Sequence, residues 1–431
     1  MFTVPLRLLL ALLIPLLLLS CGGGGGGGDG APTSAERRPF PQHTPYVTGS
    51  ILPTAPSRDT LDRVVRDFYD RWKRLYLRDD CSVAGERRVY VWFAPQEWDD
   101  RQPPTIAVSE GQGYGMMIVP LMAGHDPDAR AIFDGLYRFY KAHPSALDPR
   151  LMAWRQVEGC GDETPGATDA ATDGDLDIAF GLLLADAQWG SDGEVDYRGE
   201  ATAIIDAIMA REINRETFAP LLGDWAADDG DYFYGTRSSD FIPDHFRAFG
   251  AATGDPRWGR VAETVYGIVA TLQRNDSPVT GLLPDFIVHT GAATAGVKGL
   301  YLETALDGAY GYNACRVPWR LATDYLVSGD ARAQGAVGRM GDWVRQATGG
   351  DPSRIRSGYY LDGRPIPDSE TLSEDFLAPL AVGAMVDPTG QVWLDALWGT
   401  LATFPVAERH YYENTLHLLA LIVLSGNWWT P

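Results

Sequence analysis

The chain has 431 residues, of which 57 are acidic and 36 are basic, so its net charge at pH 7 is −21. This acidity argues against nucleic acid as a partner, and it is compatible with a neutral or a cationic substrate. Residues 56–431 are long for an average domain but contain no internal linker, so we expect one large domain with a sizeable core.

The first 21 residues have the features of an export signal. A single early cation, Arg7, precedes about a dozen mostly apolar residues, which is short for a membrane span of ~20 residues. The ending Leu18-Leu19-Ser20-Cys21 resembles a bacterial lipoprotein signal, in which Cys21 is lipidated and holds the protein on the cell envelope. An ordinary cleaved secretory signal is the alternative. Residues 22–55 begin with seven glycines and are rich in Pro, Ser and Thr, which predicts a flexible tether.

Helical periodicity dominates the rest of the chain. Apolar residues recur at three- and four-residue spacing near 57–78, 110–124, 127–142, 173–189, 194–213, 238–253, 255–275, 314–328, 331–348, 371–386, 389–403 and 409–425. Short breaks at 254–256 and 329–330 join some of these segments into helical hairpins. Six hairpins predict a toroid of inner and outer helices whose inner ends frame a cleft, although the pattern cannot establish closure. One short strand is expected within 85–94, and the long connections are expected to carry function.

Three cysteines remain after Cys21, namely Cys81, Cys160 and Cys315. An odd number permits at most one internal disulfide and leaves one thiol over. Neither the cysteine spacing nor the histidines indicate a metal site. Residues 223–231 superficially resemble a calcium loop but lack the EF-hand spacing and its final glutamate, so we expect no metal and no cofactor.

Glu110 stands at the first of two acidic helix starts, within Ser109-Glu110-Gly111-Gln112-Gly113-Tyr114-Gly115-Met116. Ser109 and Gln112 form a capping-box pattern, so Glu110 is predicted to be the first helical residue. Each glycine costs a helix about 1 kcal/mol relative to alanine, which indicates that something approaches the backbone closely. The alternative is that Glu110 only complements the helix dipole and the glycines only let helices pack.

The second acidic helix start is Ala171-Thr172-Asp173-Gly174-Asp175-Leu176-Asp177-Ile178-Ala179. Thr172 and Asp175 are predicted to cap the helix, which leaves Asp173 free to point outward and Asp177 one turn further along the same face. In the alternative interpretation all three aspartates only stabilise the helix N-terminus.

Together, these two segments resemble the signature segments of glycoside hydrolase family 8. Further similar segments lie at 151–155, 235–240, 312–320 and 411–428, so the resemblance covers nearly the whole chain after the tether. It implies an all-α (α/α)6 barrel and inverting hydrolysis of β-1,4-linked glycans. With a glycan as substrate, the glycines are expected to let a sugar chain lie against the backbone beside Glu110. Inversion requires an acid and a base roughly 6.5–9.5 Å apart, and Glu110 matches the family's acid. A helix N-terminus lowers the pKa of a carboxyl group, so we hypothesise that Asp173, which is expected to orient the sugar, and partial burial oppose that effect.

The base is where the chain departs from the common family pattern. Many members carry aspartate where this chain has Asn313, and an amide cannot accept the proton of the attacking water. A branch that includes chitosanases and mixed-linkage glucanases has asparagine there and uses a glutamate on a loop just upstream. Glu303 is therefore the predicted base and Asp307 the reserve, although most loop carboxylates are merely solvated.

Aromatic faces and charged or amide groups bind sugars, which makes several loop residues candidates for substrate contact. The candidates that match family positions are Trp154, Trp225, Tyr312, Asn313, Arg316 and Tyr412.

The leading hypothesis is an exported, lipid-anchored or secreted, monomeric endo-acting β-glycanase of the endoglucanase, licheninase or chitosanase type. Its substrate could be β-glucan or chitosan, and the membrane would be reached only through the lipid anchor. A non-catalytic glycan-binding lipoprotein that lost its base at Asn313 is the alternative from another class. A barrel-shaped lyase or an exo-acting enzyme is a third option, which the scarcity of basic residues disfavours.

Overall fold

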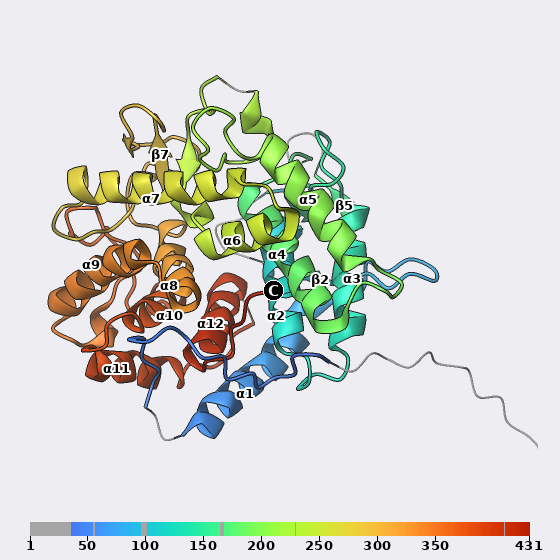
Figure 1. The fold of residues 1–431 in the computed structure, drawn as a ribbon, viewed down its shortest axis with the longest axis horizontal. Coiled ribbons are helices and arrows are strands. Elements are labelled where there is room, and N and C mark those ends of the chain that lie inside the picture. Colours follow the sequence, from blue (N-terminus) through green and yellow to red (C-terminus); the bar gives the residue numbers. More distant parts are fainter. Residues whose placement is uncertain (1–35, 55–56, 96–100, 164–167, 229, 409) are drawn as a thin grey trace, which may run out of the picture. The chain divides into compact units, whose positions relative to one another are not determined.

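Helices make up most of the part of the chain that the structure describes (Figure 1). The computed structural model describes residues 36–54, 57–95, 101–163, 168–228, 230–408 and 410–431. Its α-helices are α1 (Arg58–Tyr76), α2 (Ser109–Leu121), α3 (Ala129–Ala142), α4 (Thr172–Trp189), α5 (Tyr197–Arg211), α6 (Pro243–Thr253), α7 (Arg257–Asn275), α8 (Val317–Ser328), α9 (Ala331–Thr348), α10 (Glu374–Ala384), α11 (Gln391–Leu401) and α12 (Tyr411–Leu424). Each predicted helical segment is confirmed. The start of α6 shifts most, because residues 238–240 form a short 3-10 turn and Pro243 suits a first helical turn.

The even-numbered helices form a closed inner ring within residues 36–431. α2 contacts α4, and the contacts continue through α6, α8, α10 and α12 back to α2. The odd-numbered helices pack outside them, α1 on α12, α3 on α2, α5 on α4, α7 on α6, α9 on α8 and α11 on α10. Every residue of α2 except Glu110 is buried, whereas α1 buries a single stripe. The fold is therefore the all-α (α/α)6 barrel that the hairpins and the resemblance predict, and the ring closes.

Glycines bring α2 and α4 unusually close together. A Cβ atom at Gly113 would lie 2.7 Å from the Cβ of Asp177 and 2.8 Å from the backbone oxygen of Gly174. A Cβ at Gly174 would in turn lie 2.6 Å from the backbone of Ser109. Helix packing therefore explains the glycines, and the prediction that a sugar chain lies against this backbone is wrong. The close packing sets the first residues of the two helices side by side.

The predicted helix caps are also wrong. The cap residues of α2 and α4 are Val108 and Ala171, and neither helix start has a side-chain cap. Gln112 instead reaches across the barrel wall, where its amide accepts from Val91 N–H and donates to the Val89 and Leu136 carbonyls. Asp175 accepts a hydrogen bond from the backbone of Met152 at 3.0 Å. The side chains of Gln112 and Asp175 therefore hydrogen-bond to other segments of the chain, and neither one caps its own helix.

Small antiparallel sheets organise the long connections. In the first sheet, β1 (Leu77–Arg78) pairs with β2 (Tyr90–Val91). In the second, β4 (Arg155–Val157) lies between β3 (Thr105–Val108) and β5 (Gly161–Asp162), and in the third, β7 (Phe286–Val288) lies between β6 (Thr236–Arg237) and β8 (Ala295–Gly296). β2 is the strand predicted within 85–94. β3 runs directly into α2 and so holds the helix start that carries Glu110. Cys81 and Cys160 form a disulfide, and Cys315 is the buried remaining thiol.

Residues 36–54 form a strap on the barrel. Phe40 is buried and its N–H donates to the carbonyl of Ala123, while Thr44 donates to Gly426 near the C-terminus. The predicted tether is therefore wrong for residues 36–54, and the part before residue 36, with the predicted signal and Cys21, lies outside the described residues. Within the described residues, no helix combines the length and apolar character that a membrane span requires.

Candidate active site

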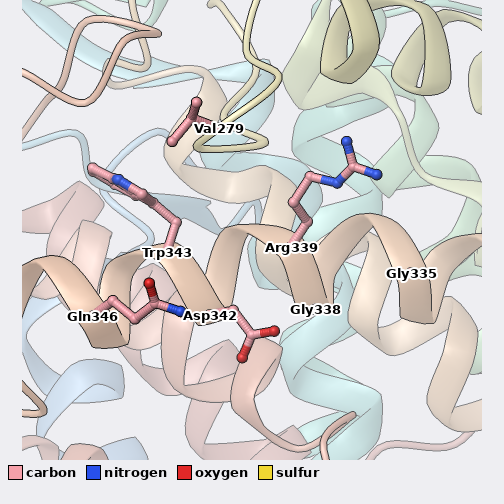
Figure 2. A pocket seen from close by; sticks show the side chains of 7 residues that line it. All are labelled: Val279, Gly335, Gly338, Arg339, Asp342, Trp343 and Gln346. Atoms are coloured by element: carbon pink, nitrogen blue, oxygen red, sulfur yellow. The ribbon is translucent and has the colours of Figure 1, made fainter.

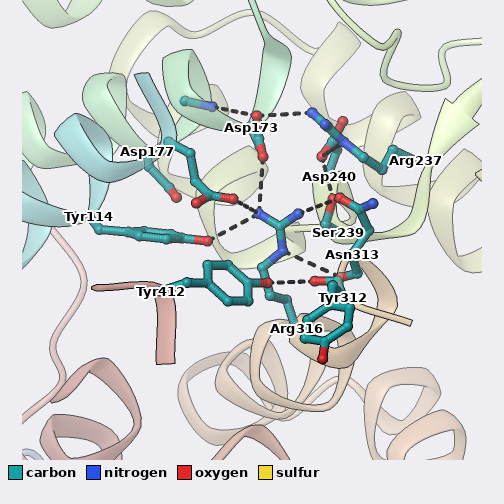
Figure 3. A network of polar contacts seen from close by, with 12 residues as sticks. Tyr114, Asp173, Asp177, Arg237, Ser239, Asp240, Tyr312, Asn313, Arg316 and Tyr412 are labelled. Carbon is teal, nitrogen blue, oxygen red and sulfur yellow. Dashed lines mark hydrogen bonds and ion pairs between the residues drawn. The ribbon is translucent and has the colours of Figure 1, made fainter. Parts of the chain in front are cut away.

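Arg316 is the centre of a polar cluster at the inner ends of the helices (Figure 3). It closes η3 (Ala314–Arg316), the turn before α8, and is only 2% exposed. Its Nη1 donates to Glu110 Oε2 at 2.6 Å, to Asp173 Oδ2 at 3.0 Å and to the Tyr114 hydroxyl at 3.1 Å. Its Nη2 donates to Asn313 Oδ1 at 2.8 Å. We call these five residues the Arg316 cluster.

Glu110 is held in place but still reaches the surface. The Tyr411 hydroxyl donates to its Oε1 at 2.9 Å, and its side chain is 19% exposed. Burial is the largest influence on the pKa of Glu110 and raises it above the ordinary value; the guanidinium of Arg316 opposes this rise, and the charge of Asp173 adds to it. The hypothesis that burial and Asp173 raise this pKa therefore agrees with the geometry, and a raised pKa keeps the carboxyl group protonated at higher pH.

Asp173 meets the same guanidinium but titrates in the opposite direction. Burial raises its pKa, yet the charges of Arg237, 2.9 Å from Oδ1, and of Arg316 outweigh burial and lower the pKa below the ordinary value. The backbone N–H of Gly174 adds a hydrogen bond of 3.0 Å. The pKa values of two carboxyl groups that share one guanidinium are thus shifted in opposite directions, upward for Glu110 and downward for Asp173.

Glu303 lies on an exposed loop whose backbone is clamped by Asp307. Asp307 is 1% exposed, and its carboxylate accepts hydrogen bonds from the backbone N–H groups of residues 301, 302, 303 and 304 at 2.7–3.0 Å. The prediction of Asp307 as a reserve base is therefore wrong, because both its oxygens serve the loop. The carboxylate of Glu303 projects from this loop, and its Oε2 accepts a hydrogen bond from Asn313 Nδ2 at 2.9 Å.

The predicted aromatic residues Trp154 and Trp225 lie on different elements. The Trp154 carbonyl accepts from the N–H of Ser109, directly beside Glu110. Trp225, in η1 (Asp224–Ala227), packs against the ring of Tyr232 at 5.1 Å, and Tyr232 packs against Tyr301 next to Glu303. These rings link the predicted sugar-binding positions to the loop of the predicted base.

Tyr312 and Tyr412 are joined by a hydrogen bond at the turn that carries Asn313. Tyr312 is 56% exposed, while its carbonyl accepts from the Tyr412 hydroxyl at 2.5 Å. The Tyr412 ring also faces the Arg316 guanidinium at 5.8 Å. Tyr312 is thus the more open of the two to a ligand, and Tyr412 secures the turn that carries Asn313.

Sequence reasoning missed several members of the site. Tyr411 touches Glu110, Tyr114 touches Arg316, and Arg237 pairs with Asp173. Burial raises the pKa of Asp240, which accepts from Arg237 at 3.2 Å, to about 6. Each of these residues lies inside a segment that resembles the family, so the resemblance could have drawn attention to it. The sequence does not show, however, which residues of such a segment face Arg316.

Two predicted features have other roles. Asp177 does not face the cluster's open side, because it is completely buried and paired with Arg320 and His245. In the calcium-like loop, Asp224 accepts from Ser145 Oγ at 2.5 Å and from Ala170 N–H at 2.8 Å. No group of three metal-ligating side chains is found among the residues that the structure describes.

A separate hollow of about 510 Å³ lies on α9 and is lined by Val279, Arg339, Trp343 and neighbouring residues (Figure 2). None of its lining residues belongs to the Arg316 cluster. The hollow on α9 is therefore separate from the carboxyl groups of the Arg316 cluster.

Comparison with known proteins places this geometry in a family. The profile of Glycosyl hydrolases family 8 matches residues 70–426. A beta-glucanase from Niallia circulans is 43% identical over 397 residues, which cover 92% of each chain, and an endoglucanase from Bacillus sp. (strain KSM-330) is 36% identical over 92% of this chain and 82% of that one. The solved apo structure of a beta-1,3-1,4-glucanase from Paenibacillus sp. X4 has a TM-score of 0.84 at 43% identity and covers 91% of this chain and 99% of that one. With its closed helical barrel, its carboxyl pair on Arg316 and this match along most of its length, the chain belongs to glycoside hydrolase family 8.

Proposed function

We propose that the protein is an endo-acting, inverting β-glucanase. The observation that carries the proposal is that Glu110 and Asp173 share the guanidinium of Arg316, at 2.6 Å and 3.0 Å. Burial raises the pKa of Glu110, whereas the charges of Arg237 and Arg316 lower the pKa of Asp173, and an acid catalyst must hold its proton where its neighbours are ionised. In the reaction, Glu110 donates its proton to the leaving glycosidic oxygen. Glu303 removes a proton from a water molecule, which attacks the anomeric carbon from the opposite face.

The arrangement of the two carboxyl groups supports inversion. An amide and a guanidinium, those of Asn313 and Arg316, lie between Glu303 and Glu110 in a chain of three hydrogen bonds. A retaining enzyme needs its carboxyl groups only ~5–5.5 Å apart, whereas an inverting enzyme leaves room for water between them. Asp173 stays ionised beside the acid and is proposed to orient the sugar at the cleavage point.

Mixed-linkage β-glucan is the proposed substrate. The relatives at 43% identity are named as a beta-glucanase and a beta-1,3-1,4-glucanase, and the next relative is named as an endoglucanase. The net charge of −21 is compatible with a neutral as well as a cationic substrate, and the names of these relatives favour the neutral glucan.

The reaction is tested by assaying reducing-sugar release from barley β-glucan, carboxymethyl cellulose, xylan and chitosan, with NMR of the first anomer formed. We expect the fastest release from barley glucan and the α-anomer as first product. Release of the β-anomer would contradict inversion, and binding without any release would favour the non-catalytic alternative.

The base is tested separately by chemical rescue. Glu303→Ala is expected to lose activity, and azide is expected to restore turnover by attacking in place of water, yielding an α-glycosyl azide. Wild-type activity in Glu303→Ala would remove this residue from the mechanism.

Export and attachment through Cys21 are a further part of the proposal, supported by the N-terminal sequence pattern. Metabolic labelling with a radioactive fatty acid should label the wild type and not Cys21→Ser. A wild type that takes up no label and is found in the medium would favour the ordinary cleaved signal.

A further inference from the structure

Asn313 is almost fully enclosed, and its amide is shared by two partners. Its side chain donates to Glu303 Oε2 at 2.9 Å and accepts from Arg316 Nη2 at 2.8 Å, and the residue is 7% exposed. With the oxygen and one amide hydrogen in use, little of this side chain is left to contact a sugar. The sequence predicts a substrate-binding role for Asn313, and the contacts point elsewhere.

The orientation of the Asn313 amide is determined by its surroundings. A guanidinium has only donors, so the amide oxygen must face Arg316 and the amide nitrogen must face Glu303. A carboxylate has only acceptors, so Glu303 receives this N–H without competition. Each of the two contacts therefore favours the same orientation of the amide. Arg316 donates to Asn313, and Asn313 donates to Glu303.

The backbone around Asn313 is held by hydrogen bonds to a buried side chain. The buried carboxylate of Asp285 accepts from the N–H groups of Asn313 at 3.1 Å, Gly311 at 3.1 Å and Ala314 at 2.6 Å. The carbonyl of Asn313 accepts from Arg316 Nε at 3.3 Å. Glu303, by contrast, projects from an exposed loop, and the side chain that hydrogen-bonds its carboxylate within the described residues is that of Asn313. The rigid member of the pair is Asn313.

We propose that Asn313 is a positioning residue that holds the carboxylate of Glu303 at a set distance from Glu110, because Arg316 binds both Asn313 and Glu110. This inference rests on the proposed function of Glu303 and Glu110. The amide is specifically suited to the task, since an aspartate at 313 would satisfy Arg316 but repel Glu303. An alanine would leave Glu303 without its link to the cluster.

A kinetic double-mutant cycle tests the proposal on barley β-glucan. Asn313→Ala is expected to lower kcat by about tenfold to a hundredfold with KM changed less than about threefold, because only the placement of the base suffers. In the Glu303→Ala background with saturating azide, the same Asn313→Ala change is expected to alter the rate less than about threefold, because no base remains to be positioned. Leu302→Ala, on the same exposed loop, is the control and should keep the wild-type kcat.

Two kinetic outcomes overturn the proposal. A similar loss in both backgrounds would mean that Asn313 acts through Arg316 or the fold, and a raised KM with unchanged kcat would restore the substrate-binding role. A crystal structure of Asn313→Ala provides a readout independent of activity: the Glu303 side chain should leave its wild-type position while the loop backbone stays clamped by Asp307. An unmoved Glu303 would refute the inference even if the wild type cleaved no glucan, whereas an inactive wild type would refute the proposed function.

Discussion

Two regions of the site are held in place by different kinds of contact: the acid side, which carries the proposed acid Glu110, and the base side, which carries the proposed base Glu303. Glu110 stands on α2, whose position is fixed by glycine-mediated packing against α4, and its neighbours are buried inner helices. Glu303 stands on an exposed loop that is held by hydrogen bonds to Asp307 and Asn313. Helix packing thus positions the proposed acid, and polar contacts position the proposed base. Damage to the first side should appear in the stability of the barrel, and damage to the second mainly in turnover.

The largest expected effect is on the acid. Glu110→Gln should lower kcat on barley glucan by about 10²- to 10⁴-fold, because the leaving oxygen is no longer protonated. Hydrolysis of an aryl β-glucoside oligomer with a leaving group that needs no protonation should be largely retained. An equal loss on both substrates would show that Glu110 does something other than donate a proton.

On the base side, Asp307→Asn should lower kcat by about tenfold to a hundredfold, since an amide cannot accept the same set of backbone N–H groups and the loop shifts. Initial rates and thermal unfolding, measured on the same variant, would distinguish a loss of turnover from a loss of stability. A variant with full kcat and a lowered melting temperature would mean that the loop clamp serves the fold and not the base.

On the acid side, Gly113→Ala should destabilise the protein by about 1–3 kcal/mol, because the added Cβ meets backbone and side-chain atoms of α4 at under 3.0 Å. Gly335→Ala in α9 is the matched control, since its Cβ would meet no atom within 4 Å. This control should be neutral or stabilise the helix by up to about 1 kcal/mol. Denaturant titration of both variants checks the prediction, and equal effects would contradict it.

The smallest expected effect is a shift in pH dependence. The negative charge of Asp173 raises the pKa of Glu110, so Asp173→Asn should lower that pKa. Because the reaction needs protonated Glu110, the basic limb of the kcat/KM profile should move to lower pH. An unchanged limb would count against a charge effect from Asp173.

The sequence predicted the barrel well, because outer helices such as α1 bury one stripe and inner helices such as α2 are long segments that are buried on almost every side. The cap predictions failed, since Gln112 and Asp175 find partners on other segments that are remote in sequence. Tyr411, the partner of Glu110, could not be told from Tyr412, because adjacent helical residues point about 100° apart and the sequence does not set the phase. The family resemblance and the missing basic oxygen of Asn313 together predict Glu303 as the base, which stays a prediction. The hydrogen bond between these two residues has no signal in the sequence.

The strap at residues 36–54 has a consequence for the order of assembly. Its contacts reach residues close to the C-terminus, such as Thr44 with Gly426 and Gln42 with Asn427. A ribosome delivers the strap first and its partners last, so these bonds cannot form until α12 has been made and has closed the ring. The contacts of residues 42–44 with the C-terminus are therefore among the last to form, although Phe40 can reach Ala123 earlier.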